Sequence, residues 1–205
     1  MNNYGINIWS DDNFVIEDGL AKINHDCKPS LISIVKDIRK QDFKGPLLLR
    51  FPHITEKQIN TLYNTFNASI KEYDYKGNFN AVFPLKVNQL PNFIHPLINE
   101  GKKFNYGLEA GSKAELVIAM TYNNINSPIT VNGFKDKEMI HLGFIAKSMG
   151  HDITLIIEGL NELEMIIEVL NETKMEAPSI GLRVRLHSGG SGLWAKSGGI
   201  NSKSG

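Results

Sequence analysis

The sequence lacks the features that mark several large classes of protein. Cys27 is the single cysteine among 205 residues, which excludes an intrachain disulfide and a cysteine-rich metal site. Basic and acidic residues number 22 each, so the formal net charge of +0 gives no support for a nucleic-acid or membrane-surface partner. No apolar run reaches the length of a membrane span, and the first residues show no basic start before an apolar segment. We therefore expect a cytoplasmic globular protein, which fits 41% hydrophobic and 21% charged residues.

The first 30 residues differ in pattern from the rest of the chain. Short strand-like runs at 7–10, 14–17 and 20–23 are separated by turns rich in aspartate, asparagine and glycine. This pattern predicts a hairpin or meander. We assign residues 1–30 to a short β segment of a separate β domain, and residues 31–205 to a second domain.

From residue 31 onward, segments with helical spacing alternate with short apolar runs. Capping boxes at Thr55-x-x-Gln58 and Ser112-x-x-Glu115 mark two of the helix starts. We expect helices over 31–38, 55–73, 91–100, 112–120, 135–149 and 160–170, and strands over 47–51, 79–87, 106–110, 128–132, 153–157 and 179–186. Such alternation with short connections predicts an α/β fold with parallel strands.

The strand count points to an incomplete barrel. About six strands are too few for a (β/α)8 TIM-type barrel. The last of them is followed by the glycine- and serine-rich residues 188–205, in which we see no closing element. We therefore expect the amino-terminal part of a partial TIM-type barrel, belonging to a longer protein.

Lys86 is the first candidate for chemistry. It follows the apolar run 81–85, at the carboxyl end of a predicted strand, where open sheets and barrels place their functional groups. A lysine in a drier pocket has its ammonium form disfavoured, so its amine becomes a nucleophile toward an aldehyde. The alternative is a lysine whose stem is buried and whose head stays in water.

Other polar residues end the neighbouring predicted strands. Glu109 could hold an amine or a ring in place, or could provide negative charge near the start of the next helix. Asn132-Gly133 ends the next strand and fits a simple turn, and Glu158-Gly159 ends the strand after it. Arg183 and Arg185 share one face of the last strand, as ion-pair partners or as anion holders.

Two familiar motifs are absent from the sequence. Residues 189–197 resemble a phosphate-binding loop, but Ala195 stands where the glycine before the lysine is required, and no helix start follows. A nucleotide-hydrolase interpretation is therefore disfavoured. The sequence has no His-x-x-x-His spacing, and its six histidines are scattered, so we predict no metal ligands.

Taken together, these segments resemble the biosynthetic arginine decarboxylases, which use pyridoxal 5'-phosphate (PLP) and have an alanine-racemase-like barrel. The matching runs are Tyr4-Gly5-Ile6 with Trp9, LLLRFPHI at 47–54, VFPLKVNQ at 82–89, GLEAGSKAEL at 107–116, NGFKD at 132–136, RVRL at 183–186, and SGLW with SGG over 191–199. The resemblance covers nearly the whole chain in order, so we regard it as specific.

The resemblance implies a function and a site. It implies a PLP-binding barrel and decarboxylation of L-arginine to agmatine and CO2 in polyamine biosynthesis. Lys86 would carry the cofactor covalently, and Glu109 would lie near it. Magnesium and a dimer-based homo-oligomer are also expected, and the 205-residue chain by itself should be inactive because other family site residues lie farther along. Alternatives are a related decarboxylase acting on ornithine, lysine or diaminopimelate, and a non-catalytic PLP-binding relative.

Overall fold

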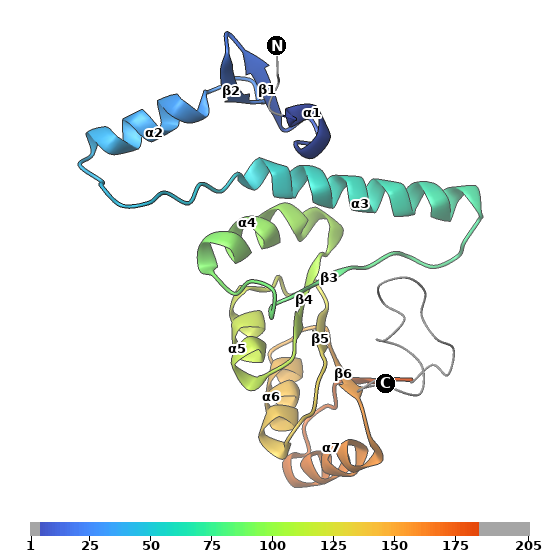
Figure 1. The fold of residues 1–205 in the computed structure, drawn as a ribbon. Helices are drawn as coiled ribbons and strands as arrows, with labels where there is room; N and C mark the ends of the chain where they lie inside the picture. The colour runs from blue at the N-terminus through green and yellow to red at the C-terminus, as the bar shows by residue number, and fades with distance from the viewer. Residues whose placement is uncertain (1–4, 185–205) are drawn as a thin grey trace, which may run out of the picture. The chain divides into compact units, whose positions relative to one another are not determined.

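A computed structural model describes residues 5–184, and the chain divides into two compact units, Met1–Ile54 and Thr55–Gly205 (Figure 1). In the first unit, β1 (Phe14–Glu17) and β2 (Leu20–Ile23) form an antiparallel hairpin with Phe14 opposite Ile23. Helix α2 (Leu31–Lys40) follows, and the Ser30 side chain caps it by accepting a hydrogen bond from the Ser33 amide. The short N-terminal β segment is thus present, whereas its assignment to a separate domain over residues 1–30 stays a prediction.

The strand predicted over residues 7–10 is wrong. Helix α1 (Ile6–Trp9) occupies this position, and the Ser10 amide closes its turn by donating to the Ile6 carbonyl at 2.9 Å. Gly5 precedes the helix with φ +66°, a backbone conformation that glycine adopts without steric cost. A run of four residues is too short for its hydrophobic period to distinguish a strand from one turn of helix.

The strand predicted over residues 47–51 is also not formed. The described backbone there belongs to no strand, and Leu48 is 74% exposed. Helix α3 (Pro52–Glu72) then begins at Pro52 rather than at Thr55. Proline suits a first helical position because its φ is already helical and its missing N–H would have no partner there.

The second unit contains a five-stranded parallel sheet. Its strands are β3 (Val82–Pro84), β4 (Gly107–Ala110), β5 (Ile129–Val131), β6 (Ile153–Ile157) and β7 (Ser179–Leu182). Their order in space, β3-β4-β5-β6-β7, is their order along the chain. The α/β class with parallel strands is confirmed, with five strands where about six were expected. Sequential parallel strands of this kind form part of a (β/α)8 barrel.

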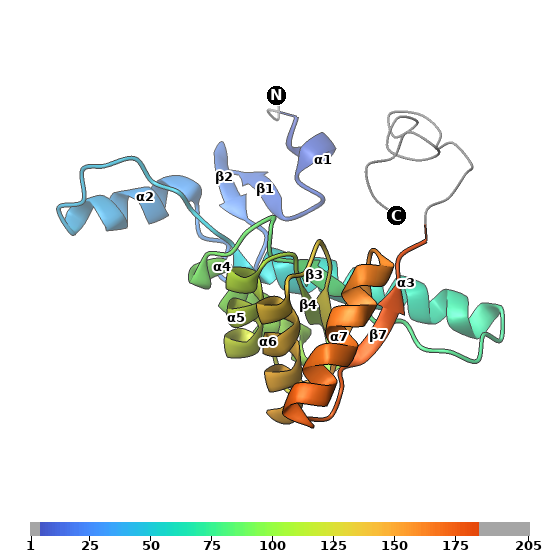
Figure 2. The same ribbon diagram turned by 90° about the horizontal axis from the view of Figure 1, so that it is seen from below.

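The helices between these strands lie along one face of the sheet (Figure 2). They are α4 (Pro91–Gly101), which continues into the 3₁₀ helix Lys102–Phe104, then α5 (Lys113–Tyr122), α6 (Lys137–Ser148) and α7 (Leu160–Thr173). Strand side chains on the helix side, such as Ile129 and Leu155, are fully buried. On the other face, alternate residues of β4, β5 and β6, such as Thr130 and Ile156, are only partly buried. No helix among residues 5–184 is long and apolar enough to cross a membrane.

Strands β4 and β5 approach each other very closely at Gly107. A Cβ atom there would lie 1.9 Å from the carbonyl oxygen of Pro128. The Leu108 amide donates to the same carbonyl at 3.1 Å, which fixes the register of the two strands. Glycine at this position therefore allows β4 to lie this close to the Pro128 carbonyl.

Candidate functional site

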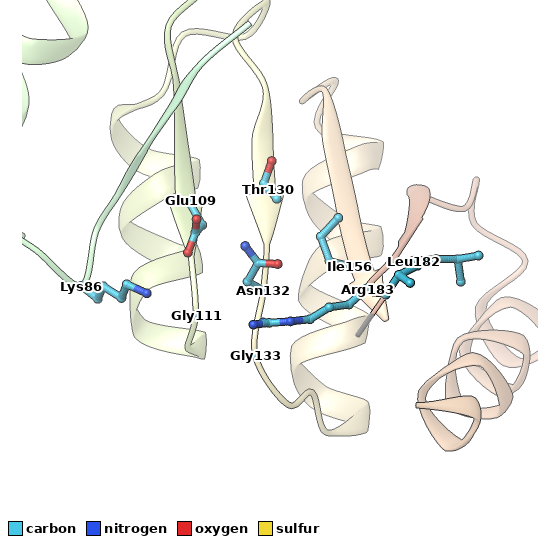
Figure 3. Close-up of a pocket in the computed structure, with 10 residues that line it drawn as sticks. Lys86, Glu109, Gly111, Thr130, Asn132, Gly133, Ile156, Leu182 and Arg183 are labelled. Carbon is cyan, nitrogen blue, oxygen red and sulfur yellow. The ribbon is translucent and has the colours of Figure 1, made fainter. Parts of the chain in front are cut away.

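A pocket of about 800 Å³ opens at the carboxyl edge of the sheet (Figure 3). Residues from the ends of all five strands and from the loops after them surround it: Lys86, Glu109, Gly111, Thr130, Asn132, Gly133, Ile156, Leu182, Arg183 and Val184. Its volume lies within the range of small-molecule sites, roughly 300–1,000 Å³. The polar strand ends that the sequence singled out therefore meet in one place.

Lys86 stands on a turn that leaves β3. The Leu85 amide donates to the Glu109 carbonyl at 2.9 Å, and the Val87 amide donates back to the Pro84 carbonyl at 3.0 Å. Leu85 is fully buried and anchors the turn, while the Lys86 side chain is exposed and directs its amine toward the pocket (Figure 3). Within residues 5–184, this amine has no hydrogen-bond or ion-pair partner. The described residues thus present the amine for reaction without enclosing it in the drier surroundings that the sequence suggested.

Glu109 lies on β4 and points into the same pocket. It is in register with Pro84 of β3 and with Thr130 of β5, so its backbone lies between these two neighbouring strands. The charge near the start of α5 comes instead from Glu115. The geometry therefore favours a pocket role for Glu109 over a helix-charge role.

Arg183 reaches the pocket from the side opposite Lys86 (Figure 3). Its Nη1 atom is 3.0 Å from Oε1 of Glu158, whose side chain is 5% exposed. The same oxygen accepts a hydrogen bond from the Gly133 amide at 3.0 Å. The ion-pair interpretation of Arg183 is confirmed, and Glu158 does more than end a strand, because it holds both Arg183 and the loop after β5. Arg185 lies outside the described residues.

A buried ion pair beneath this loop was missed by the sequence analysis. Lys135 Nζ lies 3.1 Å from Oε2 of Glu162, with side-chain exposures of 0% and 3%. The Lys135 ammonium also donates to the Gly133 carbonyl at 2.6 Å. One signal was available, since Glu162 falls on the apolar stripe of α7 with Ile166 and Val169, where a carboxylate needs a partner.

The pocket combines complementary charges. It offers one amine that has no partner within residues 5–184, one carboxylate, and one guanidinium that a buried carboxylate holds in place. Such a set can bind an anionic carbonyl compound and let the amine attack it. Residues 5–184 contain no group of three histidine, cysteine, aspartate or glutamate side chains placed to bind a metal ion.

Sequence comparison relates the chain to one kind of enzyme. A biosynthetic arginine decarboxylase from Prochlorococcus marinus (strain AS9601) is 37% identical over 211 residues, which covers 100% of this chain and 32% of the relative. One from Bacteroides thetaiotaomicron is 37% identical over 207 residues, covering 98% of this chain and 33% of the relative. The chain thus spans about a third of the length of the curated relatives it matches. No family model matches it.

Solved structures give the same relationship. The biosynthetic arginine decarboxylase from Campylobacter jejuni superimposes with a TM-score of 0.89 at 60% identity, covering 91% of this chain and 32% of that protein. The diaminopimelate decarboxylase from M. jannaschii gives a TM-score of 0.61 at 25% identity, covering 85% and 36%. The resemblance to biosynthetic arginine decarboxylases and the partial-barrel fold are therefore confirmed. Matched residues 4, 185–186 and 191–199, and the loop-like run 189–197, lie outside the described residues.

Proposed function

We propose that this chain is part of a PLP-dependent arginine decarboxylase, a carboxy-lyase that converts L-arginine to agmatine and CO2 in polyamine biosynthesis. The observation that carries the proposal is Lys86, whose amine lies at the mouth of an 800 Å³ pocket and has no partner in the described part of the chain. It stands on a partial barrel that superimposes on an arginine decarboxylase with a TM-score of 0.89. Relatives of the same name match nearly the whole chain.

The residues of the pocket fit PLP. The cofactor is an aldehyde with an anionic phosphate, and Lys86 supplies the amine that an aldehyde requires. Glu109 on β4 and Arg183 after β7 line the pocket with two strands between them, so a carboxylate and a guanidinium are both available to orient a polar ring. When bound, PLP draws electron density from the α-carbon of an amino acid as CO2 departs.

The chain's own residues would perform three tasks in such a reaction. Lys86 would bind the cofactor and, once an incoming amino group has displaced it, could return a proton to the α-carbon through Nζ. Glu109 would orient the bound group from β4. Glu158 would keep Arg183 directed into the pocket, because its buried carboxylate accepts from the guanidinium.

The test is decarboxylation by the longest product of this gene, measured as agmatine and CO2 formed from L-arginine. We expect Lys86→Arg to lower the rate by about 10²–10⁴-fold, the typical contribution of a positioned proton-transfer group. Lys174→Arg, at an exposed helix end outside the pocket, should keep the rate. Equal rates for wild type and Lys86→Arg would refute the proposal.

A related substrate is the second candidate. The match to a diaminopimelate decarboxylase at a TM-score of 0.61 favours an enzyme of the same fold acting on diaminopimelate, lysine or ornithine. A panel of these amino acids beside L-arginine separates the candidates. Cofactor retention without turnover of any of them would indicate a non-catalytic PLP-binding relative.

Several finer expectations stay predictions. They are the magnesium requirement, the dimer-based assembly, the cytoplasmic location and the inactivity of the 205-residue chain by itself. Detectable agmatine formation by the purified 205-residue chain would contradict the last of these.

A further inference from the structure

Glu115 connects two loops at the carboxyl edge of the sheet. It is the third residue of α5, after the N-cap Ser112. Its Oε2 atom accepts a hydrogen bond from the Gly111 amide at 2.7 Å, and its Oε1 atom accepts one from the Gln89 side-chain amide at 3.1 Å. Gly111 follows β4, whereas Gln89 belongs to the loop that leaves β3 and carries Lys86.

Glu162 repeats this arrangement two strands farther along the sheet. It is the third residue of α7, after the N-cap Gly159. Its Oε2 atom accepts from the Glu158 amide at 3.0 Å, and its Oε1 atom accepts from the Lys135 backbone amide at 2.8 Å. Glu158 follows β6, whereas Lys135 belongs to the loop after β5 that carries Asn132 and Gly133.

The shared geometry differs from ordinary helix capping. In a capping box, the third helical residue reaches back to the amide of the N-cap itself. Glu115 and Glu162 instead bind the amide one residue earlier, and use the second oxygen for the loop of the neighbouring strand. Each carboxylate therefore fixes the distance between two adjacent loops at the edge where the pocket opens.

Glu138 shows what a first-turn glutamate does without this arrangement. It lies in the first turn of α6, where its carboxylate is 2.6 Å from Lys113 Nζ and its side chain is 82% exposed. It places negative charge at a helix N-terminus, as the other two do, but within the described residues its hydrogen bond goes to the Lys113 side chain and not to a backbone amide. It is a matched control for charge alone.

We propose that Glu115 and Glu162 are positioning residues of the pocket. Glu115 sets the pose of the Lys86 loop, and Glu162 sets the pose of the loop that carries Asn132 and Gly133. The importance of the Lys86 pose rests on the proposed function, whereas the fixing of the two loops does not.

The experiment compares Glu115→Gln, Glu162→Gln and Glu138→Gln in the 205-residue chain. Amide hydrogen exchange reports the loops directly. We expect exchange at Gly111 to rise about tenfold or more in the first variant, and exchange at Lys135 and Glu158 to rise similarly in the second. The reason is that the charged acceptor with two oxygens becomes a neutral amide with one acceptor oxygen. Glu138→Gln should leave all three amides within about twofold of wild type, since it leaves their hydrogen bonds in place.

A second readout separates positioning from general loosening. Each variant is treated with PLP and then borohydride, and label at Lys86 is divided by label at the exposed Lys174 of the same unit. We expect Glu115→Gln to lower this ratio about threefold or more and Glu138→Gln to preserve it, because only the former loses bonds to the Lys86 loop. Overall destabilisation would instead raise exchange at amides outside the two loops, which the same experiment measures.

Each outcome decides the proposal. Exchange in Glu115→Gln and Glu162→Gln that matches Glu138→Gln would overturn it, leaving only a helix-charge role. Glu162→Gln leaves Lys135 as a buried cation, and the variant can fail to fold for that reason. In that case exchange at Gly111 in Glu115→Gln, a change at a half-exposed residue, still decides the proposal. If the wild-type 205-residue chain shows no preference for Lys86, the exchange rates alone decide whether the glutamates fix the loops, and the proposed function is decided separately with the longest product of the gene.

Discussion

Removing the buried cation beneath the pocket should destabilise the protein strongly. In Lys135→Met, the Glu162 carboxylate loses the ammonium at 3.1 Å and stays 3% exposed. The backbone amides of Lys135 and Glu158 still donate to it, at 2.8 and 3.0 Å. These two bonds satisfy part of the carboxylate but do not neutralise its charge.

The magnitude follows from the cost of an uncompensated buried charge. Breaking a buried ion pair by removing one partner costs about 3–5 kcal/mol of the free energy of unfolding. For a protein of this size, that corresponds to a decrease of roughly 6–20 °C in Tm. A second change, Glu162→Gln, removes the remaining charge, so the double variant should recover about 1–3 kcal/mol relative to the sum of the single changes.

The assay is urea unfolding of the four members of this double-mutant cycle, with Lys137→Met as the matched control. Lys137 lies in the first turn of α6 and pairs with Glu172 at 2.6 Å, with side-chain exposures of 44% and 60%. An exposed pair of this kind contributes about 1 kcal/mol or less. A loss in Lys135→Met no larger than that in Lys137→Met would refute the reasoning, because the buried charge would then be of no consequence.

Two further predictions concern the barrel itself. Gly107→Ala should lower the free energy of unfolding by about 1–3 kcal/mol or more, measured by urea unfolding, because its Cβ would lie 1.9 Å from the Pro128 carbonyl oxygen. Gly111→Ala is the control, since the nearest atom to its Cβ would be 3.5 Å away. Equal losses in the two variants would contradict the close approach at Gly107. Burial lowers the pKa of His151 from its ordinary 6.5, so the unfolded chain binds this proton first and the free energy of unfolding should fall as pH falls from about 6.5 toward the folded pKa. His151→Gln should remove this part of the pH dependence, and an unchanged slope over that window would contradict it.

Local sequence patterns predicted helices and strands correctly where a segment had a clear hydrophobic period and stood between two other segments of the alternation. The alternation after residue 79 predicted five strands that form and the helices between them, with ends displaced by a few residues. The failures, residues 7–10 and 47–51, are short apolar runs without a period of their own. Such runs become strands only when another strand pairs with them, and that partner is not encoded in the run.

The sequence predicted those residues of the site that lie at the carboxyl ends of strands. Lys86, Glu109 and Arg183 meet because parallel strands place their carboxyl ends at one edge. The carboxylates that hold the loops were not predictable in the same way. Glu158 and Glu162 act on Gly133 and Lys135 across about 25 residues of sequence, and only the folded register shows those partners.

The most direct test of the central claim is the location of covalently bound cofactor. The longest product of this gene is treated with PLP, reduced with borohydride so that any lysine linkage becomes a stable amine, and digested for peptide mass spectrometry. The account predicts label confined to Lys86 and lost in Lys86→Arg. Label at other lysines, or none, would contradict it and leave Lys86 as an ordinary lysine at a strand end.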